Sequence, residues 1–313
     1  MENDKKLVSI VVPCYNEHEN IPEMYHALKM IASELTDKYD FEFIFEDNAS
    51  TDGSQNMLRE IAAGDRSFKV ILNNRNFGPQ RSGAYNFYQA KGDAIVTLAC
   101  DFQDPPELIP KFLSEWEHGA KVVLGRNPTS KDSKILWAFR NLYYKIIGDY
   151  THNDEMSHVS GFGLYDKEVA QLFINERNPV PNFRLSVAEY GYIPAFIDYA
   201  KPERRHGVSS YNFKSLFAVA IESLPVMTRE PIHVIVKAGA GAAILFMLGF
   251  LIALVASIVN TSTFGLLIAL LLLCCVGISL IVFCIGIVGE YVGLCLGWER
   301  QVPLVIESER INF

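Results

Sequence analysis

Continuous apolar runs alternate with helical repeats along the first part of the chain. Runs of apolar, often β-branched residues are typical of buried strands, whereas apolar residues that recur every three or four positions predict helices. Strands are predicted over residues 7–12, 41–45, 69–72, 94–98, 121–124 and 162–165, and helices over 20–39, 54–63, 80–90 and 106–117. This alternation predicts βαβ units around a parallel sheet, which is an α/β fold.

Two uncharged apolar runs follow towards the end of the chain. Residues 238–259 and 264–289 contain no Asp, Glu, Lys or Arg, and each exceeds the roughly 20 apolar residues that cross a bilayer core of about 30 Å. The connection between them, residues 260–263, leaves room only for a tight hairpin. Basic residues flank the hairpin and are missing from its connection: Arg229, Lys237, Arg300 and Arg310. By the positive-inside rule, both ends of this hairpin of two transmembrane helices face the cytosol.

These patterns divide the chain into four parts. We expect a cytosolic α/β domain over residues 1–212, juxtamembrane amphipathic helices over 213–237, the transmembrane hairpin over 238–289 and a cytosolic C-terminal tail over 290–313. The apolar spacing over 213–224 favours a helix on the membrane surface, with an ordinary domain helix as the alternative. The chain begins without the apolar core of a signal peptide, so the first domain is expected in the cytosol, attached to the cell membrane.

The charge balance and the cysteines narrow the class of protein. The chain has 36 acidic and 28 basic residues and a net charge of −8, which argues against a nucleic-acid binder. The six cysteines form no CxxC pair. We therefore expect reduced thiols rather than a zinc site or a disulfide framework.

In an open α/β sheet, ligands bind beyond the carboxyl ends of the strands. This rule selects the loops 13–17, 46–52, 73–78, 99–104 and 125–127. In the first loop, Tyr15 could stack on a nucleobase and Glu17 could hold a ribose hydroxyl, although an ordinary strand-to-helix turn is an alternative. In the second loop, the alternative to a binding role is that Ser50 to Ser54 cap the next helix.

Asp101, Gln103 and Asp104 directly follow the predicted strand 94–98. Two carboxylates and an amide carbonyl are hard oxygen ligands, suited to Mg²⁺ or Mn²⁺ bound together with a ligand's phosphates. A divalent cation there would neutralise the charge that builds on a leaving diphosphate. The alternative role for Asp104, in the same loop, is to cap the helix that begins at Pro105 or Pro106.

A basic loop lies just before the predicted membrane-surface helix. Arg204 and Arg205 carry guanidinium groups, which suit phosphate oxygens, and Ser209 adds a hydroxyl to the same loop. A solvated charge run is the ordinary explanation for such residues. The adjoining membrane favours capture of a phosphate at the bilayer surface, with these three residues as candidate ligands.

Eight segments carry a resemblance to a known family. They are PCYNE (13–17), EDNASTDGS (46–54), NRNFGPQRSGAYNF (74–87), DFQDPPELIP (101–110), LGRN (124–127), RRHGVSSYNF (204–213), GEYVG (289–293) and PLVIE (303–307). In this order they resemble the family-2 glycosyltransferases of the polyprenyl-phosphate type, the group that contains dolichyl-phosphate mannose synthases and bactoprenol glucosyltransferases. The resemblance covers nearly the whole chain, and DFQDPPE and NRNFG are specific in combination.

The resemblance implies a single GT-A (Rossmann-like) domain that uses a nucleotide-sugar donor, expected to be UDP-linked, and Mg²⁺ or Mn²⁺. It implies donor contacts from Pro13, Tyr15, Glu17, Asp47, Asp101, Gln103 and Arg126, with Asp47 reading the base. Asp101 and Gln103 would also hold the metal. Arg204 would meet phosphate, and with Asp101 it would carry catalysis.

The implied activity is an inverting transfer of one sugar to a polyprenyl phosphate, such as undecaprenyl phosphate, at the cytosolic membrane face. The product would be a lipid-linked monosaccharide for cell-envelope glycan modification. The resemblance also implies a homo-oligomer, such as a tetramer.

Four positions depart from the family's pattern. Ala99 and Gly161 stand where acidic residues are usual, and Pro79 and Ser210 stand where lysines are usual. A sugar-alcohol acceptor needs a general base as it attacks, whereas a lipid monophosphate, with a second pKa of about 6, is already largely a dianion. The missing acid at Gly161 therefore favours a phosphate acceptor, and the missing carboxylate at Ala99 predicts weaker or rearranged metal binding.

Two other functions remain open from the sequence. A processive polysaccharide synthase would share the domain, but the chain lacks the QxxRW motif of that group and has fewer predicted spans. A catalytically inactive membrane scaffold is the second alternative, and Ala99 and Gly161 are the residues that favour it.

Overall fold

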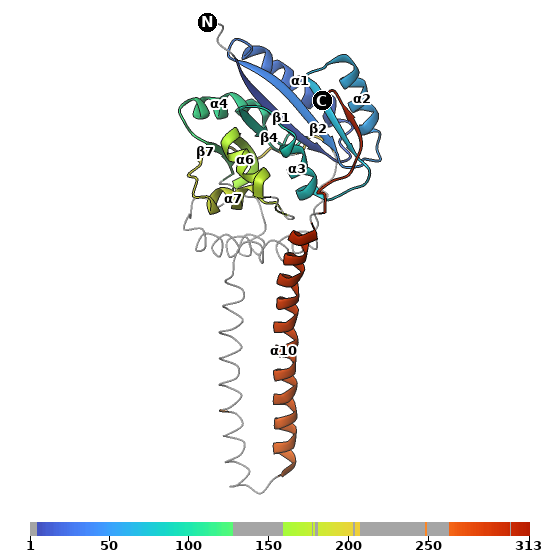
Figure 1. Cartoon of the computed structure of the whole chain (residues 1–313), viewed down its shortest axis with the longest axis vertical. Coiled ribbons are helices and arrows are strands. Elements are labelled where there is room, and N and C mark those ends of the chain that lie inside the picture. The colour runs from blue at the N-terminus through green and yellow to red at the C-terminus, as the bar shows by residue number, and fades with distance from the viewer. Residues whose placement is uncertain are drawn as a thin grey trace. The chain divides into compact units, whose positions relative to one another are not determined.

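A computed structural model of the chain describes residues 5–127, 159–176, 178, 181–202, 204–206, 248, 263–300 and 302–313 (Figure 1). The chain divides into two compact units. The first comprises Met1–Ser210 together with Val302–Phe313, and the second comprises Tyr211–Gln301. The end of the chain thus belongs to the first unit, which holds all the loops selected from the sequence.

The first unit is built on one sheet with the strand order β7-β5-β6-β4-β1-β2-β3-β8. Its strands are β1 (Lys6–Cys14), β2 (Tyr39–Asp47), β3 (Phe68–Asn73), β4 (Ala94–Thr97), β5 (Val122–Arg126), β6 (Val159–Asp166), β7 (Ala195–Asp198) and β8 (Glu307–Ile311). Strand β1 pairs in parallel with β2 and β4, and β2 pairs in parallel with β3. Strand β6 is antiparallel to β4 and β5, and β8 is antiparallel to β3. The α/β fold is confirmed, although the sheet is mixed rather than all-parallel.

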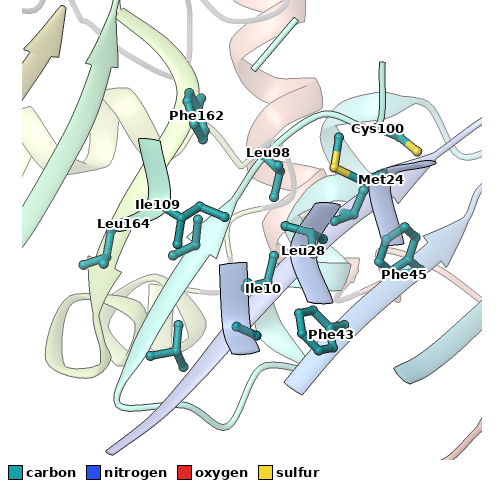
Figure 2. Close-up of a cluster of buried hydrophobic side chains, with 14 of the residues drawn as sticks. Ile10, Met24, Leu28, Phe43, Phe45, Leu98, Cys100, Ile109, Phe162 and Leu164 are labelled. Carbon is teal, nitrogen blue, oxygen red and sulfur yellow. The ribbon is translucent and has the colours of Figure 1, made fainter. Parts of the chain in front are cut away.

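Helices cover both faces of this sheet because side chains alternate along each strand. In β1, Val8, Ile10 and Val12 pack on one face and Val11 packs on the other. Figure 2 shows the first of these two cores, in which side chains of α1 and β2 lie together with Ile10. The first face is covered by α1 (Asn20–Glu34), α2 (Ser54–Gly64) and α4 (Ile109–Glu117), the last entered through the 3-10 turn η1 (Pro106–Leu108), and the second by α3 (Pro79–Tyr88), α6 (Lys167–Glu176) and α7 (Phe183–Glu189).

The sequence pattern predicts neither strand β8 nor β7, α6 or α7. Strand β8 differs most from an ordinary strand. Its residues ESERI are mostly charged, and such a segment becomes a strand only because the edge of β3 offers it a partner. Beyond it, the Asn312 side-chain amide donates to the backbone carbonyls of Ala62, Asp65 and Phe68 at 2.8–3.1 Å. The expected tail, residues 290–313, therefore splits between the end of a helix and an edge strand of the sheet (Figure 1).

The second unit contains the long helix α10 (Thr263–Arg300). The second predicted span, residues 264–289, falls inside this helix. The first predicted span and the predicted juxtamembrane helices lie outside the described residues, apart from Leu248. A search of the described part of the chain found no helix long and apolar enough to cross a membrane.

Candidate active site

Hydrogen bonds join the loops after β1 and β2 into one surface. The Asn16 backbone N–H donates to Ser50 Oγ at 2.8 Å, and Asn16 Oδ1 accepts from the Thr51 backbone N–H at 2.8 Å. The Glu17 backbone N–H donates to Ser54 Oγ at 3.1 Å. The N-cap residue of α2 is Gly53, which has no side chain to cap the helix, but Asp52 Oδ1 accepts from the Ser54 backbone N–H at 3.0 Å. The two serines connect the loops, and Asp52 satisfies the first N–H of α2.

Backbone strain gathers at the same edge of the sheet. Asn16, Ala49 and Phe102 have φ values of 55°, 61° and 59°, in the left-handed region that costs an L-residue about 1–2 kcal/mol. Each follows the carboxyl end of a different strand, β1, β2 and β4. Strain of this kind persists where the surrounding structure enforces it, and it clusters at binding sites.

Asp47, at the end of β2, is fully buried. Its Oδ2 accepts from the Ser50 backbone N–H and from Gln55 Nε2, both at 2.9 Å. Its Oδ1 is buried and has no hydrogen-bond partner among the described residues. An unsatisfied buried oxygen is costly, and this atom keeps an acceptor capacity that the described residues do not use.

Glu46 is buried beside Asp47 but faces the other way, towards α3. It accepts hydrogen bonds from Ser82 Oγ at 2.5 Å and from Asn73 Nδ2 at 2.6 Å. Burial raises its pKa to about 8, against the effect of these two bonds, and the charges of Asp47 and Glu307 raise it further. Glu46 therefore joins β2, β3 and α3 as a largely protonated acid at neutral pH.

The loop after β1 presents both of its candidate side chains to the edge. Tyr15 is 37% exposed, so its ring is available for stacking, and Pro13 lies at the end of β1 opposite Glu46. Glu17 accepts from Asn20 Nδ2 at 2.5 Å. Burial raises the pKa of Glu17, whereas the Asn20 bond and the nearby Arg204 charge lower it.

Asp101 and Arg204 form an ion pair at this edge. Arg204 Nη2 lies 2.8 Å from Asp101 Oδ2, and the Asp101 side chain is only 5% exposed. Asp101 Oδ1 accepts from the Gln103 backbone N–H at 3.1 Å. The structure thus brings together the loop after β4 and the basic loop, which are about a hundred residues apart in sequence.

Asp104 does not cap the following helix. Its Oδ2 accepts from the Ala99 backbone N–H at 3.0 Å and its Oδ1 from the Tyr199 hydroxyl at 3.1 Å, and neither η1 nor α4 has a side-chain cap. The expectation that Asp104 is a helix cap is therefore wrong. Its carboxylate closes the loop 99–104 on itself and links it to Tyr199, the residue that follows β7.

Arg205 and Arg126 each hold a carboxylate of the protein. Arg205 Nη1 lies 2.9 Å from Glu23 Oε2. Arg126 grips Asp198 with two bonds, Nε to Oδ1 at 2.6 Å and Nη2 to Oδ2 at 3.2 Å, and this pairing lowers the pKa of Asp198. Arg126 lies at the carboxyl end of β5, as expected, and both arginines have partners that the sequence did not suggest.

Asp101 and Gln103 suit a divalent cation that is bound partly by the protein and partly by a substrate's phosphates. No group of three or more His, Cys, Asp or Glu side chains that could hold a metal occurs among the described residues. Mg²⁺, however, is usually held by one or two carboxylates together with substrate phosphates and waters. Asp101 and the half-buried Gln103 provide that minimal set, and Arg204 occupies one Asp101 oxygen.

Ala99 and Gly161 stand where the family usually has acids. Ala99 follows β4, and Gly161 lies in the neighbouring strand β6. Thr97 of β4 pairs with Gly163 of β6, so Ala99 and Gly161 each lie two residues further towards the carboxyl edge. A Cβ built on Gly161 meets nothing within 4 Å, so a side chain there is sterically acceptable. The third departure, Pro79, takes the first position of α3, which suits proline. Ser209 and Ser210 lie outside the described residues.

Three residues of the site escaped the sequence analysis: Glu23, Phe102 and Asp198. From the sequence alone, Glu23 is expected to be a surface residue in the first turn of α1, and Phe102 is expected to be a core residue. Both interact with Arg205, and the only signal in the sequence was that Phe102 lies between two candidate ligands. Asp198 had no local signal at all.

Comparison with known proteins now decides the family. The model of "Glycosyl transferase family 2" matches residues 9–173, which carry most of the loops described above. The chain belongs to this family. The resemblance seen in the sequence is confirmed, and membership makes the chain a glycosyltransferase.

Two relatives extend over most of the chain. A bactoprenol glucosyl transferase of Shigella phage SfV is 30% identical, over 97% of this chain and 99% of its own length. An undecaprenyl-phosphate 4-deoxy-4-formamido-L-arabinose transferase of Pseudomonas fluorescens is 31% identical, over 76% of this chain and 71% of its own. Among solved structures, mannosyl-3-phosphoglycerate synthase from Rubrobacter xylanophilus has a TM-score of 0.50 at 14% identity, over 69% of this chain and 70% of that one. At that identity the structural likeness supports the fold alone.

Proposed function

We propose that this glycosyltransferase moves one sugar from a UDP-linked donor to a polyprenyl phosphate, such as undecaprenyl phosphate, at the cytosolic face of the cell membrane. The observation that carries the proposal is the contact between Asp101 and Arg204, 2.8 Å apart at the carboxyl edge. A carboxylate suited to a cation and diphosphate thus touches a guanidinium suited to a phosphate. The activities named for the two relatives support a polyprenyl acceptor.

The nucleotide is proposed to lie across the loops after β1 and β2. Tyr15 stacks on the base, and Asp47 Oδ1, which lacks a partner among the described residues, accepts an N–H of its edge. Pro13 shapes the loop from the end of β1, and Glu17 accepts from a ribose hydroxyl. Arg126 completes the donor side from the end of β5, where Asp198 fixes its guanidinium.

Asp101 and Gln103 are the residues that would hold Mg²⁺ or Mn²⁺. A bound divalent cation supplies neutralisation of the charge on the leaving diphosphate. A cation held there would compete with the Arg204 guanidinium for Asp101 Oδ2. Arg204 would meet phosphate oxygens through its N–H groups.

The acceptor is proposed to attack without a general base. A phosphate dianion needs no proton removed, so alignment and a tolerant electrostatic environment suffice. Gly161 and Ala99 leave the edge without two carboxylates that would repel such an acceptor. Direct displacement at the anomeric carbon inverts its configuration. Arg204, Arg205 and Ser209 are the residues of the basic loop that the sequence predicts to meet the phosphate.

The chain is proposed to be anchored by the apolar hairpin 238–289, with juxtamembrane helices over 213–237. The uncharged runs and the flanking basic residues support this topology, which leaves the α/β domain and the C-terminus in the cytosol. Glycines recur at positions 286, 289 and 293, and such small residues permit close helix packing. A homo-oligomer, such as a tetramer, is part of this proposal.

The proposal is tested with the full chain purified in detergent, Mg²⁺ or Mn²⁺, and a panel of UDP-sugars. We expect UDP release that depends on added polyprenyl phosphate. Release with simple alcohols but not with the phosphate would exclude the proposed acceptor. UDP binding without turnover, for every donor and either metal, would favour the inactive scaffold, and products with many sugars per lipid would favour the processive synthase.

A further inference from the structure

Two consecutive residues of the loop after β4 contact two consecutive residues of the basic loop. Asp101 pairs with Arg204 at 2.8 Å. Phe102 lies under Arg205, whose Cζ is 3.9 Å from the centroid of the Phe102 ring. The two loops are therefore joined at two adjacent points, one ionic and one cation–π.

The Arg205 side chain is already committed to protein groups. Its Nη1 lies 2.9 Å from Glu23 Oε2, while its Cζ lies over the Phe102 ring. A guanidinium that pairs with a carboxylate and rests on an aromatic face is held in place by two protein groups. Phe102 itself is buried and holds a left-handed backbone, φ 59°, so the ring is a fixed support.

The next residue adds contacts to the same region of α1. His206 Nδ1 lies 3.4 Å from Glu19 Oε2 and its Nε2 lies 3.7 Å from Glu23 Oε1. The His206 carbonyl accepts from Asn20 Nδ2 at 3.5 Å. Residues 204–206 therefore cross the first turns of α1 as a strap, which is attached by Arg205 and His206 and carries Arg204 over Asp101.

We propose that Arg205 is a positioning residue, held between Glu23 and Phe102, which fixes the strap and so sets Arg204 against Asp101. This inference rests on the proposed function and changes one part of it. Of the two arginines, only Arg204 meets the phosphate, whereas Arg205 keeps its protein partners throughout the reaction. Glu23 and Phe102 become part of the machinery without touching substrate.

A charge exchange between Arg205 and Glu23 tests the inference. In Arg205→Glu the new carboxylate faces Glu23, and in Glu23→Arg two guanidiniums face each other, so each single variant should lose at least about tenfold in kcat/KM through misplacement of Arg204. The double variant Glu23→Arg/Arg205→Glu restores the ion pair, but neither the cation–π contact nor the contact between His206 and Glu23. It should recover part of the loss. If Arg205 binds the acceptor phosphate itself, the double variant stays as low as Arg205→Glu.

A surface ion pair elsewhere supplies the matched control. Arg59 Nη2 lies 2.8 Å from Glu309 Oε2, with exposure close to that of the Arg205–Glu23 pair. Reversal of Arg59, of Glu309 or of both should leave kcat/KM unchanged. A loss in these variants equal to that at Arg205 would mean that any broken surface pair lowers activity, and it would overturn the inference.

Amide hydrogen exchange of the full chain, without substrates, tests the same inference when no transfer occurs. Each single reversal should speed exchange in residues 199–206 and 99–103, and the double variant should restore protection. Unchanged exchange in the single variants would overturn the positioning role. A wild-type chain that transfers no sugar refutes the proposed function, but the exchange pattern still decides whether Arg205 holds the strap.

Discussion

The Arg204 guanidinium lies 2.8 Å from the Asp101 carboxylate, and the two side chains are 25% and 5% exposed. The nearly buried carboxylate thus has its charge balanced before any ligand binds. If Asp101 holds a divalent cation, as proposed, that cation would compete with the Arg204 guanidinium for the same carboxylate oxygen.

Asp101→Asn should abolish transfer while the chain stays folded. The amide removes the charge that holds the cation, but it keeps an oxygen for the Gln103 backbone N–H, and Arg204 is exposed enough to be solvated. Asp104→Asn is the matched control, because both Asp104 oxygens are bonded to Ala99 and Tyr199 of the chain itself. Thermal unfolding and sugar transfer should be measured for both. Full activity in Asp101→Asn would remove this residue from the site.

Asp47→Asn should weaken UDP binding without destabilising the fold. Oδ2 already accepts two bonds, so the new NH₂ group is expected at the Oδ1 position, where it opposes an N–H of the base. A mismatch of this kind costs about 1–3 kcal/mol, or roughly 5- to 150-fold in Kd. Because the wild-type oxygen lacks a partner among the described residues, the free energy of unfolding of the variant should equal or exceed that of the wild type. Isothermal titration with UDP and Mg²⁺ measures the first effect, and an unaltered Kd would place the base elsewhere.

Glu46→Gln should flatten the pH dependence of stability. The wild-type carboxyl has a folded pKa of about 8 and an ordinary unfolded value near 4.5, so the folded chain holds one more proton between these values. Stability from this group is therefore present at low pH and is lost as pH rises through about 8, by roughly 3–6 kcal/mol in all. Glutamine cannot ionise, so chemical unfolding of the variant between pH 5 and 8.5 should show a shallower decline. Equal declines would mean that Glu46 is charged when folded.

Gly161→Asp should not accelerate transfer. The position has room for a side chain, and the new carboxylate would stand where the family usually has an acid. A general base typically contributes about 10²–10⁴-fold, but a phosphate dianion has no use for one and is repelled by the added charge. We expect kcat/KM for the lipid phosphate to fall or stay level. A rise of about tenfold or more would indicate an acceptor that must lose a proton.

The sequence predicts most of the sheet because local patterns determine its strands. The apolar runs at 7–12 and 41–45 lie within β1 and β2, and the rule that ligands bind at carboxyl ends selects Asp47 and Asp101 correctly as edge residues. Strand β8 escapes prediction because a charged segment pairs with β3 only after the chain has returned from the second unit. Its stability comes from partners more than two hundred residues away.

In the candidate site, the sequence does not reveal which arginine pairs with which acid. Arg204 and Arg205 are adjacent and chemically alike, yet one reaches Asp101 and the other reaches Glu23 and Phe102. Which guanidinium meets which carboxylate depends on how the strap crosses α1. That path is set by tertiary contacts, and no local spacing encodes it.

Mass spectrometry of the lipid product tests the central claim most directly. The purified full chain should be incubated with undecaprenyl phosphate, Mg²⁺ or Mn²⁺ and each of a panel of UDP-sugars, and the extracted lipid weighed. We predict a mass increase of one sugar residue, joined as a phosphodiester, with one class of donor. Lipid of unchanged mass with every donor and both metals, despite measurable UDP binding, would contradict the account.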